Sequence, residues 1–333
     1  MLQATRSRLL MMCCMAVIAS ATASVRAQDE NQGELERQRD VIYGRKYGTA
    51  LTMDVMKPAE PRGLGVIFVV SGGWYSAHNA INQGFARPLL DRGYTVFAVV
   101  HGSQPKFTIP EIVEDLHQAV RFIRYNAKDY GIDPERIGIS GLSAGGHLSL
   151  MQGTAGKPPA DEPRNGDPVA GVSSRVQAVA CFFPPTDFLN YGREGNVALG
   201  RGVLRNFRAP FDFHEFDRQA NTFVPVTDDA RLLEIGKEIS PIYHVTSDDP
   251  PTLIIHGDAD ELVPIQQAER IIERLEEAGV PNKLVVKDGA GHGWPTIQAD
   301  LELCADWFDK HLANKTSDEA EEEEEAAAAA QGN

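Results

Sequence analysis

The chain has 333 residues, of which 42% are hydrophobic and 24% are charged, and its formal net charge is -15. This composition is ordinary for a globular protein, and the length is enough for one large domain or two small ones. Because nucleic acid would repel so acidic a chain, no nucleic-acid partner is expected.

The first 27 residues have the pattern of a secretory signal peptide. Arg6 and Arg8 form a basic start, residues 9–21 form an apolar run interrupted only by Ser20, and small residues follow. The run is short for a membrane-spanning helix, so we expect an exported protein, periplasmic or extracellular, with no stable membrane insertion after cleavage. An uncleaved anchor is the alternative. Residues 28–40 are interpreted as a linker.

Between residues 41 and 313 the pattern alternates strand and helix. Apolar and polar residues alternate weakly over 43–56, which suits an antiparallel start to a sheet. Apolar runs predict strands over 66–70, 95–100, 136–140, 176–183, 252–255 and 283–286. Helical spacing predicts helices over 111–125, 147–151, 265–278 and 296–312. Continuous apolar strands separated by helices indicate an α/β fold whose mostly parallel sheet is covered on both faces.

Two segments depart from this rhythm. Residues 190–239 are rich in Gly, Pro, Asn and Asp without a clear period, and they predict an insertion over the sheet edge. Residues 314–333 form an acidic tail, with seven acidic groups from Asp318 to Glu325, and like charges that repel predict disorder there. Setting aside these seven acids and the three arginines of the first 27 residues leaves the body at -11, acidic in its own right.

The most informative local pattern is Gly141-Leu142-Ser143-Ala144-Gly145-Gly146, between a predicted strand and a helix-compatible stretch. It matches G-x-S-x-G, in which a nucleophilic serine occupies a tight strand-to-helix turn. Side chains at positions 141 and 145 would collide with neighbouring backbone, and the following helix places N–H groups beside the reacting centre. The pattern predicts Ser143 as a nucleophile; a glycine-rich turn that merely packs is the alternative.

A nucleophilic serine needs a histidine base, and the base needs an orienting carboxylate. In this architecture the acid precedes the histidine, and both follow the serine. Asp258 and Asp260 come just after the predicted strand 252–255, and spacing does not decide between them. His292 follows the last strand within five residues that include three glycines, which predicts a loop histidine. These segments lie where parallel strands end, the usual place for a site.

The remaining reactive side chains have less informative settings. His147 and His256 are expected to be structural, and His101, which follows a strand, is a weaker candidate for the substrate pocket. The nine histidines lack metal-ligand spacing, so neither a metal nor another cofactor is predicted. Cys181 and Cys304 are expected to be buried free thiols, with a bond between them as the alternative.

A third component of such a site is an oxyanion hole. Ser71-Gly72-Gly73-Trp74 follows the predicted strand 66–70, where such a hole is built, and its glycines would let backbone N–H groups approach a substrate oxygen. A loop that only turns is the alternative.

Together these segments resemble the α/β-hydrolase superfamily. Within it the chain is similar to the acetyl-xylan and feruloyl esterase-like branch, which is related to hormone-sensitive-lipase-type carboxylesterases. The resemblance spans about residues 41–312 and rests on segments 141–147, 256–264 and 289–293. It implies an α/β-hydrolase fold, with a mostly parallel central sheet, helices on both faces and a lid or cap insertion.

The resemblance also assigns roles that spacing leaves open. The family's carboxylate stands three positions before Val-Pro, which is Asp260 here. By analogy the backbone donors of the oxyanion hole are Gly73, Trp74 and Ala144. The family usually has His-Gly-Gly at the oxyanion strand, whereas Ser71 replaces that histidine here, a departure that bears on substrate preference.

The resulting hypothesis is an exported serine hydrolase that cleaves carboxylic esters through Ser143, His292, Asp260 and an acyl-enzyme. Its substrate would be a small-molecule or polysaccharide ester, such as an acetyl or feruloyl ester of plant or algal polysaccharide. A peptidase, amidase or formamidase on the same fold is one alternative, and a non-catalytic binding protein is another. Nothing in the sequence indicates an oligomeric state. The aromatic residues of the insertion would bind an aryl or sugar group or merely cover the sheet: Phe207, Phe211, Phe213, Phe216 and Phe223.

Overall fold

The computed structural model describes residues 35–159 and 168–313. The predicted signal peptide and acidic tail lie outside these residues. Contacts divide the chain after Glu36, and the larger unit begins at Arg37.

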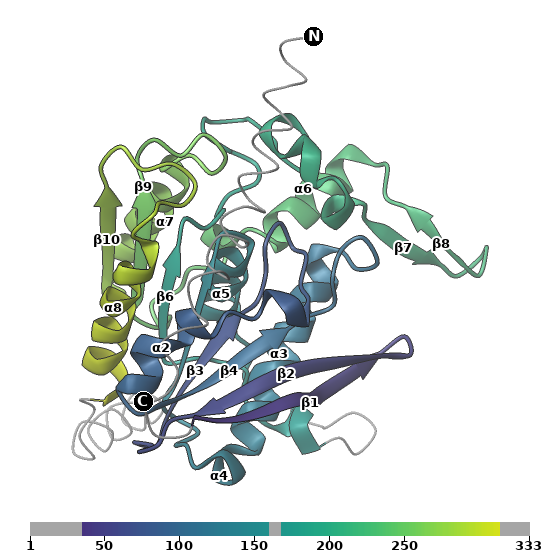
Figure 1. The fold of residues 1–333 in the computed structure, drawn as a ribbon. Coiled ribbons are helices and arrows are strands. Elements are labelled where there is room, and N and C mark those ends of the chain that lie inside the picture. The colour runs from purple at the N-terminus through teal and green to yellow at the C-terminus, as the bar shows by residue number, and fades with distance from the viewer. Residues whose placement is uncertain (1–34, 160–167, 314–333) are drawn as a thin grey trace, which may run out of the picture. The chain divides into compact units, whose positions relative to one another are not determined.

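An eight-stranded sheet forms the centre of this unit, with the strand order β1-β2-β4-β3-β5-β6-β9-β10 (Figure 1). Strand β2 pairs antiparallel with β4, and every pair from β4 to β10 is parallel, as the apolar runs predicted. The strands are β1 (Glu36–Lys46), β2 (Thr49–Lys57), β3 (Leu64–Val69), β4 (Tyr94–Val100), β5 (Ile137–Leu142), β6 (Ala178–Phe182), β9 (Thr252–Gly257) and β10 (Asn282–Lys287).

Helices pack on both faces of the sheet. Helices α2 and α8 pack together on one face, and α3 packs beside α5 on the other. A capping box starts α3, in which the Thr108 N–H donates to the Glu111 carboxylate at 2.8 Å. The α-helices are α2 (Gln83–Asp91), α3 (Ile109–Tyr125), α4 (Ala127–Tyr130), α5 (Ala144–Thr154), α6 (Asp229–Glu238), α7 (Gln266–Glu277) and α8 (Ile297–Phe308). Shorter turns are η2 (His78–Ala80), η4 (Pro168–Gly171), η5 (Gly202–Phe207), η6 (Ala209–Phe211), η7 (Pro241–Tyr243) and the π-helical η8 (Asp309–Ala313).

The first strand begins at Glu36, inside the segment interpreted as a linker. Its residues are polar and mostly exposed, so no apolar pattern marks it in the sequence. The turn into β2 is formed by Tyr47 and Gly48, both with positive φ, as in the two-residue turns that join antiparallel strands. Strand β1 is further held by Arg37, whose Nε donates to the buried carboxylate of Asp54 at 2.8 Å.

The predicted insertion, residues 190–239, contains η5, η6, α6 and a hairpin of β7 (His214–Asp217) and β8 (Thr222–Pro225) that forms its own two-stranded sheet. The hairpin projects away from the central sheet (Figure 1). The aromatic residues of the insertion have two different surroundings. Phe211 and Phe213 are buried in the core, whereas Phe216 and Phe223 are exposed and contact each other across the hairpin.

The two cysteines of the described residues, Cys181 in β6 and Cys304 in α8, are buried free thiols, as expected. Burial raises the pKa of both thiols, which keeps them protonated and unreactive. Across residues 35–159 and 168–313, no helix is long and apolar enough to cross a membrane.

Candidate active site

The turn that follows β5 presents Ser143 at the carboxyl end of the sheet. Ser143 has φ 54° and ψ -117°, a conformation that L-residues rarely adopt, and it is the N-cap of α5. A Cβ on Gly141 would lie 2.5 Å from the backbone of Gly145, and one on Gly145 would lie 2.8 Å from the Val69 carbonyl oxygen. The two glycines are therefore required for the reason that the sequence suggested: side chains there would collide with backbone.

Three residues from distant parts of the chain meet at this turn. The Nε2 atom of His292 lies 2.8 Å from the Ser143 hydroxyl, and its Nδ1 atom lies 2.7 Å from Oδ2 of Asp260. Since the carboxylate can only accept, Nδ1–H donates to Asp260 and Nε2 is left to accept from Ser143. Asp260 follows β9 and His292 follows β10, so the ends of three parallel strands, β5, β9 and β10, supply the set.

Asp260 is held ionised although its side chain is fully buried. Burial favours the neutral form, but the nearby His256 ring and the hydrogen bonds from His292 and the Val263 amide outweigh it and hold the pKa of Asp260 well below its usual range. Its Oδ1 atom accepts from the amides of Leu262 and Val263, both at 2.9 Å. The carboxylate is thus fixed in one orientation toward His292.

His256 at the end of β9 is a buried histidine next to this carboxylate. Its Nε2 atom lies 2.8 Å from the Val263 carbonyl oxygen and 3.6 Å from Oδ2 of Asp260. It is structural, as the sequence suggested, but it also faces the site, which its position at a strand end could have indicated.

Asp258, the competing acid, has a different place. It is exposed, and its Oδ1 atom accepts from the Gly289 amide at 2.6 Å. It therefore joins the loop that carries His292 to the loop that carries Asp260, whereas Nδ1 of His292 bonds to Asp260. The geometry separates the two acids where spacing does not.

The loop after β3 has the backbone of an anion-binding turn. Gly73 and Trp74 both have positive φ, 56° and 59°, which is rare for a residue as bulky as tryptophan. Within the described part of the chain, no group accepts a hydrogen bond from the N–H of either residue. Ala144 is the first residue of α5, so its N–H also has no partner inside the helix. The three amides proposed from the resemblance are thus free to bind a substrate oxygen.

Trp74 is anchored by its indole ring rather than by its backbone. The ring is buried, and its Nε1–H donates to Nδ1 of His147 at 3.1 Å. His147 in turn donates from Nε2 to the Ile239 carbonyl oxygen at 2.7 Å. Burial lowers the pKa of His147 to about 4, so the ring stays neutral and keeps one donor and one acceptor.

Ser71, which replaces the family's usual histidine, also has a histidine partner. Nε2 of His101 lies 2.9 Å from the Ser71 hydroxyl, and Nδ1 of His101 lies 2.8 Å from the Gly102 carbonyl oxygen. The carbonyl requires the proton on Nδ1, so Ser71 donates to Nε2. His101 is buried, and both ring nitrogens are used in these two hydrogen bonds.

Two phenylalanine rings border the site, and sequence reasoning missed one of them. Phe183, just after β6, has φ 35°, and its ring centroid lies 4.6 Å from that of His292. Phe207 of the insertion packs so closely on the oxyanion loop that a Cβ on Gly73 would lie 2.5 Å from its ring. The place of Phe183 at the end of the predicted strand 176–183 was its only signal in the sequence.

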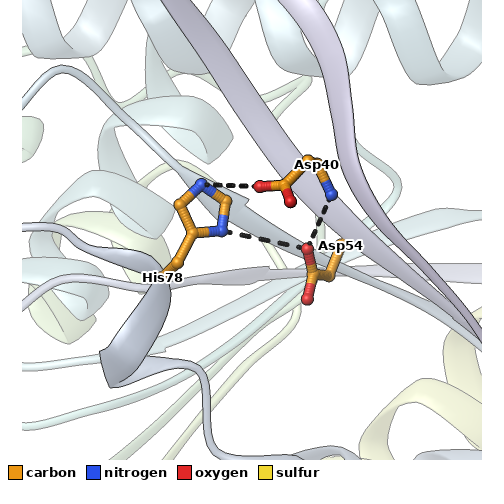
Figure 2. Close-up of side chains that lie close together, drawn as sticks. All are labelled: Asp40, Asp54 and His78. Carbon is orange, nitrogen blue, oxygen red and sulfur yellow. Dashed lines mark hydrogen bonds and ion pairs between the residues drawn. The ribbon is translucent and has the colours of Figure 1, made fainter.

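A cluster of possible metal ligands lies elsewhere, on β1, β2 and η2. Asp40, Asp54 and His78 each bring one ligand atom within 4.8 Å of the others (Figure 2). Asp54 is already neutralised by Arg37, and its other oxygen accepts from the Asp40 amide at 3.0 Å. Nε2 of His78 lies 2.6 Å from the Thr52 hydroxyl. These contacts account for the cluster as an ion-pair network.

The fold and this site define a class: an α/β hydrolase with a serine, histidine and aspartate joined by hydrogen bonds. The BD-FAE family profile matches residues 53–275, most of the chain. The chain therefore belongs to the BD-FAE family of α/β-hydrolase carboxylesterases, and the resemblance seen in the sequence is confirmed.

Individual relatives agree with this assignment. The chain is 30% identical to the esterase LipC of Mycobacterium tuberculosis over 78% of its own length and 60% of LipC. A truncated carbohydrate esterase from gut microbiota is 26% identical, with a TM-score of 0.68 over 86% of this chain and 99% of that one. An esterase of the Planctomycetes species Thermogutta terrifontis is 25% identical, with a TM-score of 0.63 over 85% and 95% of the two chains. That esterase has also been solved with propionate and with butyrate bound. The chain spans only 50–62% of the lengths of its curated relatives.

Proposed function

We propose that the protein hydrolyses carboxylic esters through an acyl-enzyme on Ser143. The observation that carries the proposal is the unbroken hydrogen-bonded series from Asp260 through His292 to Ser143, at 2.7 and 2.8 Å. The donors and acceptors in this series suit the chemistry, because the imidazole is held in the tautomer that can accept the serine proton.

In the first half of the reaction Ser143 attacks the ester carbonyl carbon while its proton passes to Nε2 of His292. The negative charge moves to the carbonyl oxygen, which the amides of Gly73, Trp74 and Ala144 are free to stabilise. The carbon–oxygen bond then breaks, and His292 returns the proton to the departing alkoxide. Asp260 stabilises the imidazolium that exists between these two transfers.

In the second half a water molecule attacks the acyl-enzyme. His292 takes the proton of the water, and the second tetrahedral intermediate uses the same three amides. The bond to Ser143 breaks, the serine recovers its proton from His292, and the carboxylic acid leaves. The site is then restored.

We propose acetyl or feruloyl esters of a plant or algal polysaccharide as the substrate, and export as the location of the reaction. The similarity to a carbohydrate esterase supports the first proposal, and the small acids bound by the Thermogutta esterase favour a short acyl group. The basic start and apolar run of residues 1–27 support the second.

The test is hydrolysis of p-nitrophenyl acetate, acetylated xylan and methyl ferulate, compared with the matching anilide and N-formylkynurenine. We expect ester cleavage by the wild type and none above background by Ser143→Ala. Cleavage of the anilide or the formamide with no cleavage of esters would favour an amidase or formamidase. Inertness toward all of them would favour a binding protein on a hydrolase scaffold.

A further inference from the structure

The segment from Tyr191 to Phe211 crosses from one side of the site to the other. At its start the Tyr191 hydroxyl donates to the Leu262 carbonyl oxygen at 3.1 Å, on the loop that carries Asp260. Toward its end Phe207 packs on Gly73 of the oxyanion loop. The segment therefore contacts both the loop that carries Asp260 and the oxyanion loop.

The short helix η5 within the segment has two different faces. Leu204 is buried and Phe207 is half-buried, and these residues are three apart, so they share a face in a 3-10 helix. By the same spacing Arg205 and Arg208 share the adjoining face, and both are exposed. Arg201, the N-cap of η5, is exposed as well. We call Arg201, Arg205 and Arg208 the arginine rim.

The arginine rim has no acidic partner among the described residues, although the chain as a whole carries -15. Between residues 191 and 211 the one acid is Glu194. Some other arginines of the protein are paired with carboxylates. Arg231, at the far end of the same insertion, is paired with three glutamates: Glu215, Glu234 and Glu238.

An unpaired guanidinium group is a receptor for planar or tetrahedral anions, since it presents several donors in a fixed fork. In an acidic protein a cluster of three such groups attracts an anion more than the surrounding acidic surface does. A neutral polysaccharide would not use these charges, whereas an anionic ligand would.

We propose that the arginine rim binds the anionic groups of an acylated, negatively charged glycan, so that the enzyme prefers esters on sugar chains that bear carboxylates or sulfates. This inference rests on the proposed ester hydrolysis at Ser143 and adds the charge of the substrate to it. Phe207 then supplies the apolar surface between the ester and the rim.

The test compares kcat/KM for acetyl release from three glycans of equal acetyl content: a neutral xylan, a xylan with uronic acid side groups and a sulfated glycan. We expect wild-type kcat/KM to be about tenfold higher on at least one anionic glycan, and the advantage to shrink as salt screens the charges. The two anionic substrates distinguish carboxylate from sulfate recognition.

The variant R201Q/R205Q/R208Q should lose most of the preference, measured as the ratio of kcat/KM on the anionic glycan to that on the neutral one. The matched control is Arg39→Gln, an exposed arginine on β1 without an ion-pair partner in the described part of the chain, and it should keep the wild-type ratio.

Equal rates on all three glycans at low salt, or an unchanged ratio in the triple variant, would overturn the proposal. These failures differ from failure of the proposed function, because p-nitrophenyl acetate would still be hydrolysed by the wild type. Loss of that activity as well would refute ester hydrolysis itself.

Discussion

The indole Nε1–H of Trp74 donates a hydrogen bond to Nδ1 of His147, and this bond joins the loop of the proposed oxyanion hole to the helix behind the nucleophile. Trp74 has positive φ, a backbone conformation that needs support from its surroundings. His147 provides that support, and it is itself held by a hydrogen bond from its Nε2 to the Ile239 carbonyl oxygen, at the end of the insertion.

We therefore expect His147→Phe to damage both stability and catalysis. The substitution leaves the Trp74 indole N–H and the Ile239 carbonyl without partners in a buried place, which costs about 1–3 kcal/mol for each group. Urea unfolding should show a total loss of about 2–6 kcal/mol for the two groups, and kcat should fall more than KM changes because the oxyanion amides shift. His214→Phe, at an exposed histidine of β7, should behave as the wild type. Unchanged kcat in a folded His147→Phe protein would contradict this role.

Stability should fall in mildly acidic solution because of buried histidines. Burial lowers the pKa of His101, His117 and His147 to about 4 each. In the unfolded chain these rings bind protons near pH 6.5, so the free energy of unfolding is unaffected by them above pH 7 and falls as the pH drops from 6.5 to 4, by about 3 kcal/mol per histidine. Burial raises the pKa of Asp115 to about 6, which works in the opposite direction over the same range and offsets about one histidine.

The measurement is urea unfolding at several pH values between 4 and 8. Between pH 6.5 and 4, His147→Gln should lose about 3 kcal/mol less stability than the wild type. The variant lacks the histidine that binds a proton in the unfolded chain but not in the folded protein. Parallel curves for the two proteins would show that His147 is not held neutral in the fold.

The two aspartates of the β9 loop should respond differently to the same substitution. In Asp260→Asn the remaining oxygen would stay with the Leu262 and Val263 amides, so an NH2 group would face Nδ1 of His292 and favour the wrong tautomer, and kcat should drop by about 10⁴-fold. Asp258→Asn keeps an oxygen that can accept from the Gly289 amide, so kcat should change by no more than a few-fold. Steady-state hydrolysis of p-nitrophenyl acetate compares them. The reverse order of effects would make Asp258 the orienting acid.

Gly73 should be intolerant of a side chain because of Phe207. A Cβ there would lie 2.5 Å from the Phe207 ring and would require an unfavourable positive φ. Gly73→Ala should lower kcat/KM by about 10²–10³-fold, the usual effect of losing one oxyanion donor. The double variant Gly73→Ala/Phe207→Ala should recover part of the loss, since the collision is removed and the backbone strain remains. If the double variant recovered no activity, the loss in Gly73→Ala would come from backbone strain alone and not from the collision with Phe207.

Much of the site could be predicted because its members sit at strand ends. The glycine-flanked Ser143 and His292 each carry a local pattern, and the chain order of acid and base follows from the architecture. The choice between Asp258 and Asp260 could not be made from spacing. It depends on burial, since Asp260 is enclosed against His292 while Asp258 is exposed.

Other parts of the fold and site could not be predicted from the sequence. Helix α2 is short and contains Pro88, a residue that usually breaks a helix, so it was not among the predicted helices. The pairing of Ser71 with His101 joins two different strand ends, and the contact of Phe183 with His292 joins two others. Such contacts depend on the order of the strands in the sheet, which a single sequence does not display.

The most direct test of the account is to react the protein with a fluorophosphonate probe and locate the label by mass spectrometry of proteolytic peptides. The account predicts one label on Ser143, strong slowing of labelling in His292→Ala, and no label in Ser143→Ala. Labelling of another residue, or none at all on folded wild-type protein, would contradict a nucleophilic Ser143 and with it the proposed hydrolase.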